Sequence, residues 1–281
     1  MSVDEKIAHS RRLVTDLLDR LDGDGKKVVG IVGLFSGGND STTLCHIFRD
    51  VVTHYAHANT GIGIEETRQY VRDTCAAWGR PLLEGLPLPN RTYDVMVMGE
   101  AKAVSPRAKY PLVWPGGFPG AGAHGTFLRV LKTEWMNAVR NMLVGDRRRE
   151  RVLFLGGRRI EESARRKTKL RQIGPIRLAG SAVYLDAIHF WSKTDIASYR
   201  TLCADCPRNA VADHLHMSGE CLCGCYAHPG ELEEIRFFKP DVAAEIEDKE
   251  KALKERGLDI PPHTLRWGWN GKGRCASGCN D

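Results

Sequence analysis

The residues best suited to bind phosphate form the sequence Ser-Gly-Gly-Asn-Asp-Ser, from Ser36 to Ser41. Glycines let backbone amides approach an anion closely, and the N-terminus of a helix adds partial positive charge. The hydroxyls of Ser36 and Ser41 can donate hydrogen bonds to phosphate oxygens. With a buried strand expected before it and a helix after it, the segment predicts a pyrophosphate-binding loop rather than a structural glycine turn. The chain has no Gly-x-x-x-x-Gly-Lys-Ser/Thr sequence, so a kinase or an ordinary ATPase loses its main support.

Cysteines form the second group with chemical potential, because seven of the nine lie between Cys203 and Cys279. In a chain without an apolar signal segment, this clustering favours metal or sulfur chemistry over a disulfide framework. Four thiolates would suit a [4Fe–4S] cluster or a structural zinc ion, and reduced thiols without a metal are the alternative. The candidate ligands are Cys203, Cys206, Cys221, Cys223, Cys225 and His228.

Two further cysteines, Cys275 and Cys279, lie in a glycine-rich tail. A tail of this kind could deliver a persulfide or resolve one as a disulfide, because the thiolate is the competent nucleophile. It could instead complete the metal site. The sequence leaves these two roles open.

The net charge of +6 is concentrated in one segment. Between Arg147 and Arg171, eleven Lys and Arg residues face three Glu residues, which gives this segment a charge of +8 and leaves −2 for the rest of the chain. Such a run is either a solvated helical face or a site for phosphate or nucleic acid.

The composition, with 42% hydrophobic and 27% charged residues, is that of an ordinary globular protein of 281 residues. The longest apolar run, from Val28 to Phe35, is far shorter than the roughly 20 residues that a membrane span requires. We therefore expect a soluble, cytoplasmic protein with no membrane partner.

Elements that would position these groups alternate between strands and helices. An amphipathic helix ending near Gly23 is followed by expected strands over Lys27–Phe35, Val51–Ala58, Val152–Leu155 and Val183–Ile188. Helices are expected over Thr42–Arg49, Glu65–Trp78 and Phe127–Val144, with a long Gly- and Pro-rich loop over residues 99–125. The alternation predicts an α/β fold with a parallel sheet over residues 1–200, followed by a cysteine-rich helical region over residues 201–281.

Ser36–Ser41 is similar to the PP-loop, Ser-Gly-Gly-x-Asp-Ser, of the adenine nucleotide α-hydrolase-like superfamily of ATP pyrophosphatases. More of the chain resembles one branch, the phosphoadenosine phosphosulfate reductase-like family. The matching segments are His57–Gly61 with Glu65-Glu66-Thr67, where Asn59 replaces the usual Asp; Phe118-Pro119 through Leu131-Lys132; Gly157–Arg166, matching Gly-x-Arg-x-x-Glu-Ser-x-x-Arg; and Asp186–Tyr199. The resemblance implies a Rossmann-like nucleotide-binding domain.

This resemblance also implies which residues hold the nucleotide. They are Ser36, Gly37, Gly38, Asn39, Asp40, Ser41, Asn59, Thr60, Gly61, Lys132, Gly157, Arg159, Glu162, Ser163 and Arg166. Asp40, Ser41 and Arg159 would be catalytic. Asp40 would be one of the ligands of a Mg²⁺ ion that binds with ATP. Gly224–Pro229 resembles the Gly-Cys-x-x-Cys-Pro of iron–sulfur members involved in DNA phosphorothioation, with His228 in place of the last cysteine.

The intact loop resembles members that cleave ATP between the α and β phosphates. The Glu-Cys-Gly-Leu-His sequence of the reductases does not occur here. The resemblance therefore favours an ATP pyrophosphatase that adenylates an acceptor for sulfur transfer, with nucleic acid as the first acceptor to test and a sulfur donor as a further partner. One alternative is a phosphoadenosine phosphosulfate reductase that forms sulfite with a thiol reductant, using Cys275 or Cys279. Another is a non-catalytic nucleic-acid-binding zinc module.

Overall fold

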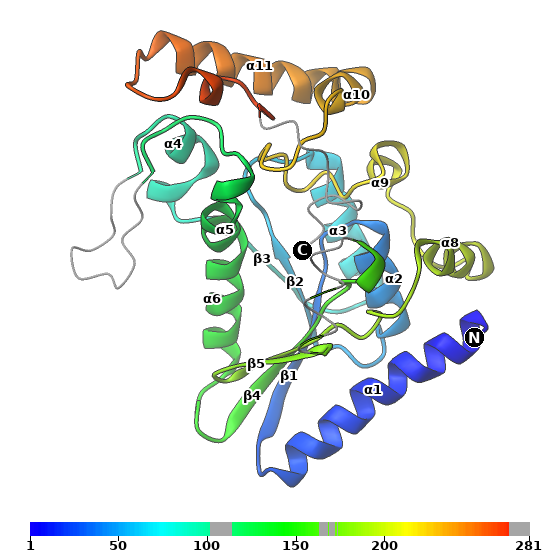
Figure 1. Cartoon of the computed structure of the whole chain (residues 1–281). Helices are drawn as coiled ribbons and strands as arrows, with labels where there is room; N and C mark the ends of the chain where they lie inside the picture. Colours follow the sequence, from blue (N-terminus) through cyan, green and yellow to red (C-terminus); the bar gives the residue numbers. More distant parts are fainter. Residues whose placement is uncertain (102–113, 163–167, 169–171, 173, 270–281) are drawn as a thin grey trace.

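The computed structural model describes residues 1–101, 114–162, 168, 172 and 174–269. At its centre lies a six-stranded sheet in the order β3-β2-β1-β4-β6-β5 (Figure 1). All neighbouring strands pair in parallel except β5, which runs antiparallel to β6 at the edge. The strands are β1 (Lys27–Leu34), β2 (His54–Ala58), β3 (Leu82–Gly85), β4 (Glu150–Leu155), β5 (Ile176–Ala179) and β6 (Ala182–Leu185).

Helices cover both faces of this sheet. One core cluster joins α1 and α2 to β1 and α8 through side chains such as Leu17, Leu44 and Trp191. On the other face, Val139 of α6 packs against Val32 and Phe154 of the sheet. The helices are α1 (Val3–Gly23), α2 (Asn39–Ile47), α3 (Glu65–Ala77), α4 (Tyr93–Val97), α5 (His124–Leu128), α6 (Glu134–Leu143), α8 (Lys193–Leu202), α9 (Ala210–Leu215), α10 (Glu231–Phe238) and α11 (Pro240–Glu255).

A third core cluster forms at one end of the molecule, where α10 and α11 lie near α4 (Figure 1). It contains Phe118 and Phe127 from the middle of the chain and Ile235 and Ile246 from the C-terminal helices. Residues from both sides of position 200 therefore share one core. The division of the chain at that position stays a prediction.

The expected α/β class with a parallel sheet is confirmed, and most differences are local. β2 begins at His54 rather than Val51, because Val51 and Val52 donate backbone hydrogen bonds back to Phe48 in a turn. The helix expected over Phe127–Val144 contains a π-helical turn, Arg129–Thr133, between α5 and α6. In the described part of the chain, no helix is long and apolar enough to cross a membrane.

Candidate functional site

The predicted phosphate loop lies between the end of β1 and the start of α2. The hydroxyl oxygens of Ser36 and Ser41 are 3.0 Å apart, and the Ser41 hydroxyl donates to the Gly38 carbonyl oxygen at 3.0 Å. Gly38 is the N-cap of α2 and supplies no side-chain cap for the first amides of this helix. The loop therefore places two hydroxyls and the N-terminus of a helix at one point, which is the geometry that binds phosphate.

Two glycines make this arrangement possible. Gly37 has a φ of +78°, and a Cβ there would lie 2.7 Å from Cγ2 of Thr67 on α3. A Cβ on Gly157, which follows β4, would lie 3.2 Å from the backbone nitrogen of Ser41. The backbone after β4 thus packs directly onto the first turn of α2, and larger residues would push the two segments apart.

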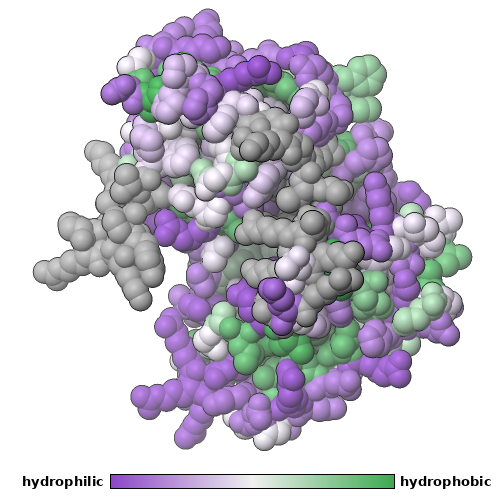
Figure 2. Space-filling model, in the orientation of Figure 1, coloured by the Kyte–Doolittle hydropathy of each residue, from purple (hydrophilic) through white to green (hydrophobic). Residues whose placement is uncertain are grey.

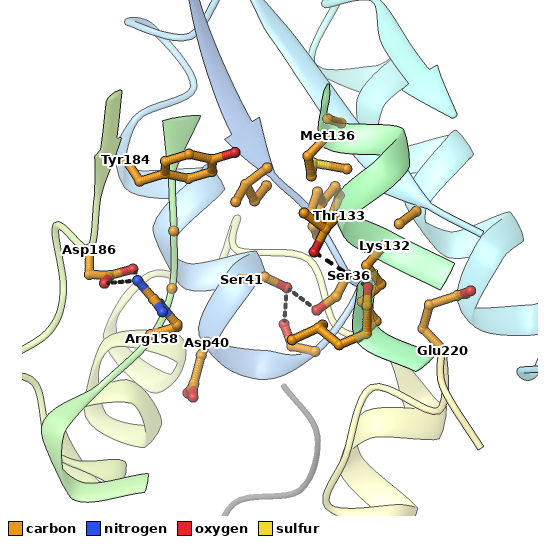
Figure 3. Close-up of a pocket in the computed structure, with 18 of the residues that line it drawn as sticks. Ser36, Asp40, Ser41, Lys132, Thr133, Met136, Arg158, Tyr184, Asp186 and Glu220 are labelled. Carbon is orange, nitrogen blue, oxygen red and sulfur yellow. Dashed lines mark hydrogen bonds and ion pairs between the residues drawn. The ribbon is translucent and has the colours of Figure 1, made fainter. Parts of the chain in front are cut away.

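A cavity of about 200 Å³ opens beside the loop at the carboxyl ends of the strands. Figure 3 shows Ser36 and Ser41 at its base, Lys132, Thr133 and Met136 on one side, and Arg158, Tyr184 and Asp186 on the other. Its walls expose more apolar than polar surface, because Leu34, Ala56, Ala58 and Leu128 also line it. A cavity that combines polar groups with apolar walls suits a ligand that joins phosphates to a flat ring.

Two consecutive arginines after β4 face different partners. Arg158 lines the cavity, and its guanidinium donates to both carboxylate oxygens of Asp186, at 3.0 and 2.7 Å. The Nε of Arg159 donates to a carboxylate oxygen of Asp40 at 2.9 Å, and both residues are at least 93% buried. Asp40 accordingly points away from the two serines in Figure 3. The predicted phosphate contact by Arg159 and Mg²⁺ binding by Asp40 stay predictions. Arg158 and Arg177 are arginines that line the cavity.

The π-helical turn shapes the opposite wall. Leu128, Lys132, Thr133 and Met136 all line the cavity. A π turn inserts one extra residue into a helix, so both Lys132 and Thr133 face the same side as Leu128. Lys132 thus lies across the cavity from Arg158 (Figure 3), and its contact with a nucleotide stays a prediction.

Asn59, Thr60 and Gly61 follow β2 and form a tight turn. The Asn59 side chain accepts from the Gly61 amide at 3.1 Å and donates to Glu84 at 3.0 Å. The amide of Thr60 donates to the carboxylate of Glu220 at 2.8 Å, and Glu220 is 1% exposed and contributes to the cavity wall. These three residues of the predicted set stabilise the turn and position the Glu220 carboxylate. They do not line the cavity themselves.

Of the predicted nucleotide-binding residues, six line the cavity: Ser36, Gly38, Asp40, Ser41, Lys132 and Gly157. Gly37, Asn39, Arg159 and Glu162 lie on the segments that carry these residues. Ser163, Arg166, Cys275 and Cys279 lie outside the described residues. Sequence reasoning missed Arg158, Tyr184, Asp186 and Glu220. A signal existed for Asp186, because it directly follows β6 and the carboxyl ends of neighbouring parallel strands meet at one edge.

The candidate metal ligands are divided between two cores. Cys206 packs with Trp191 and Tyr199 in the cluster around α1 and α8, whereas Cys223 and Cys225 pack with Phe127 and Trp267. Among the described residues, no three Cys, His, Asp or Glu side chains are grouped closely enough to hold a metal ion. The four-thiolate set of Cys203, Cys206, Cys221 and Cys225 is divided between these two cores, and its metal binding stays a prediction.

One part of the cysteine region lies beside the cavity. Cys221 and Cys223 line a small pocket together with Leu128 and Lys132, and these last two residues also line the main cavity. His124 contributes to the same small pocket. The structure thus brings two thiols into the pocket that Lys132 also lines, whereas Cys203 and Cys206 lie at the end of α8.

The basic segment is also divided. Arg147, Arg148 and Arg149 are exposed in the turn before β4, and Arg158 and Arg159 follow this strand. Six residues of extended strand separate the two groups by roughly 20 Å. The turn before β4 lies at the lower edge of the molecule in Figure 1, where the surface in Figure 2 is strongly hydrophilic. Arg165–Arg171 contains only one described residue.

Comparisons with known proteins give similarity in fold only. No protein-family model matches the sequence, and no curated protein matches it. One similar solved structure is a phosphoadenylyl-sulfate (PAPS) reductase from Candida auris, with a TM-score of 0.45 and 14% identity, covering 76% of this chain and 92% of that one.

Two other structures are similar to the same degree. The U34-tRNA thiolase NcsA from Methanococcus maripaludis, solved with its [4Fe–4S] cluster, has a TM-score of 0.44 and 10% identity, over 92% of this chain and 80% of that one. NMN synthetase from Francisella tularensis has a TM-score of 0.45 and 14% identity, over 93% and 99%. The residues of the site therefore carry the functional proposal.

Proposed function

We propose that this chain is an enzyme that binds ATP with Mg²⁺ at Ser36–Ser41, releases pyrophosphate and transfers AMP to an acceptor. The observation that carries the proposal is the loop itself. Two serine hydroxyls and the uncapped start of α2 converge at the base of a cavity whose walls combine apolar side chains with Lys132 and Arg158. This arrangement suits the stabilisation of negative charge on a leaving pyrophosphate.

Two cations support the same chemistry. Arg158 and Lys132 line opposite walls of the cavity, so both can approach phosphate oxygens without a change in the fold. Arg158 is held by two hydrogen bonds to the buried Asp186, which fixes the plane of its guanidinium. A fixed guanidinium loses little conformational freedom when it binds an oxyanion.

The second half of the proposal is sulfur transfer to the adenylated acceptor. Cys221 and Cys223 support it, because their pocket shares Leu128 and Lys132 with the nucleotide cavity. The outer sulfur of a persulfide on one of these cysteines would attack the adenylated atom and displace AMP, since adenylation creates a good leaving group. The thiolate of the other cysteine would then attack the resulting disulfide and release the thiolated product, which leaves a disulfide between the two cysteines for a thiol reductant to reduce. We propose Cys221 and Cys223 for this role in addition to Cys275 and Cys279.

Product analysis tests the first half. Purified protein is incubated with Mg²⁺, ATP and candidate acceptors, and nucleotides are separated by chromatography. We expect AMP and pyrophosphate, with Ser41→Ala at least tenfold slower, because it removes a donor that faces the developing charge. Thr201→Ala is the matched control, since its hydroxyl donates to the local Ala197 carbonyl on the exposed side of α8. Formation of ADP, or full activity in Ser41→Ala, would refute the proposal.

The second half is tested with a persulfide source and with tRNA or DNA as acceptor. After digestion, mass spectrometry searches for sulfur-containing nucleosides or phosphorothioate dinucleotides. We expect product with wild type and none with Cys221→Ser/Cys223→Ser. Sulfite release from phosphoadenosine phosphosulfate, with no thiolated product from any acceptor, would favour the reductase instead.

A further inference from the structure

The phosphate loop is held from behind by a residue that lies far away in the sequence. Asn209 is 4% exposed and directly precedes α9. Its side-chain amide nitrogen donates to the Gly37 carbonyl oxygen at 2.9 Å and to the Thr67 hydroxyl at 3.0 Å. Thr67 in turn donates to the Ser218 carbonyl at 2.7 Å. Asn209 thus ties the loop to α3 and to the segment that leads into the cysteine region.

The bond to Gly37 fixes the peptide group that bears the next amide. The carbonyl of Gly37 and the N–H of Gly38 belong to one planar trans peptide, so they point in opposite directions. Gly38 lines the cavity, and Gly37 does not. Holding the carbonyl on the far side therefore keeps the Gly38 N–H on the cavity side, where a phosphate oxygen would accept it.

Gly37 needs such support because its conformation is unusual. Its φ of +78° is accessible to glycine, but glycine is also the residue with the most alternative conformations. The chain could therefore rotate this peptide at little energetic cost if the carbonyl had no partner. The Asn209 amide nitrogen donates one hydrogen bond to this carbonyl and is itself held by a second bond to Thr67, so the peptide loses that freedom.

Asn209 also has a local role, which uses a different atom. Its side-chain oxygen accepts from the Val211 amide at 3.1 Å and so caps α9. With the amide reversed, two oxygens would face each other at Gly37 and two donors would meet at Val211. Only the observed orientation satisfies all three contacts, and the two roles can be separated by substitution.

We propose that Asn209 is a positioning residue for the phosphate loop, which presets the Gly38 amide for the nucleotide. Its effect on ATP binding rests on the function proposed above, but its effect on the loop does not. Asn209→Ser keeps an oxygen that can cap α9 and is too short to reach Gly37. Asn209→Asp keeps the shape and the cap, and removes both donors.

Hydrogen exchange without nucleotide measures the loop alone. We expect amides of the peptide spanning residues 36–42 to exchange roughly tenfold faster in both variants than in wild type, because a buried carbonyl loses its partner. Thr92→Ala is the matched control. It removes the side-chain cap of α4, which accepts from Val95, and leaves the loop untouched. Unchanged exchange over residues 36–42 in Asn209→Ser would overturn the inference.

Equilibrium binding of ATP with Mg²⁺ supplies the second measurement. We expect a Kd roughly tenfold higher in Asn209→Ser and higher still in Asn209→Asp, with Thr92→Ala equal to wild type. If wild type itself does not bind ATP, the proposed function fails and the exchange result still decides the role of Asn209. If the loop exchanges faster but the Kd stays within twofold of wild type, Asn209 does not preset the amide for the nucleotide.

Discussion

The phosphate loop and the cysteine region place their reactive groups in different ways. Ser36, Gly38 and Ser41 are positioned mainly by the backbone, because a strand, a glycine turn and a helix follow one another within a few residues. Cys206 and Cys223 are positioned by side-chain packing in two separate hydrophobic cores. The first arrangement depends on local conformation, and the second depends on which segments meet in the folded chain.

Substitution of Gly37 tests how far the loop depends on backbone conformation. We expect Gly37→Ala to lower the free energy of unfolding by about 3 kcal/mol and to abolish ATP binding. Positive φ costs an L-residue about 1–2 kcal/mol, and crowding against Thr67 adds a similar amount. Denaturant unfolding and ATP titration measure both effects.

Gly79 provides the matched control for that substitution. It has a φ of +63°, and a Cβ added there would meet no other atom within 4 Å. Gly79→Ala should therefore lower the free energy of unfolding by only about 1 kcal/mol and leave ATP binding intact. Equal losses of unfolding free energy in the two variants would mean that the close packing at Gly37 adds nothing to the cost of the substitution.

The ion pair between Asp40 and Arg159 tests whether the loop also depends on side chains. We expect Asp40→Asn to lower the free energy of unfolding by about 3 kcal/mol, because it leaves a buried guanidinium without its counter-charge. Asp50→Asn is the control, since its pair with Arg11 is exposed and should contribute less than about 1 kcal/mol. A small effect at Asp40 would show that this ion pair contributes little to holding the start of α2.

The same contrast explains which parts of the fold and of the site could be predicted from the sequence. The loop was predicted because Ser36, Gly37 and Ser41 are contiguous, and the parallel sheet followed from strands alternating with helices. β3 and β5 were missed because each has only four residues and none of these is fully buried. Short, partly exposed strands carry little hydrophobic pattern.

Contacts between distant segments could not be predicted. Asn209 forms a hydrogen bond with Gly37, which lies 172 positions away in the sequence. Glu220 forms one with Thr60, which lies 160 positions away. Arg158 and Arg159 are neighbours in the sequence, so only the path of the chain after β4 decides which of them faces the cavity. The cysteine spacings likewise gave no sign that Cys206 and Cys223 enter different cores.

Alkylation tests whether the two groups of cysteines are separate. Burial raises the pKa of Cys206 to about 11, so about one thousandth of this thiol is ionised at pH 8. We expect iodoacetamide to modify Cys206 at least tenfold more slowly than the partly exposed Cys221, as followed by mass spectrometry of peptides. In guanidinium chloride the two should react alike. Joint protection of Cys203, Cys206, Cys221 and Cys225 after loading with iron and sulfide, or with zinc, would instead show one shared metal site.

The smallest expected effect concerns Glu84, which holds the turn at Asn59 through side chains. Two hydrogen bonds from Arg72, together with one from Asn59, lower the pKa of Glu84 to about 2 from its ordinary value of 4.5. The unfolded chain takes up this proton first as the pH falls, so the stabilisation is complete above about pH 5 and is lost between about pH 4.5 and 2.

Glu84→Gln removes this titration. Because the pair is partly exposed, we expect a loss of only about 1 kcal/mol at pH 7, with the difference from wild type shrinking as the pH falls toward 2. Urea unfolding at a series of pH values measures it. A difference that stays constant with pH would mean that the charge of Glu84 contributes nothing to the stability of the folded chain.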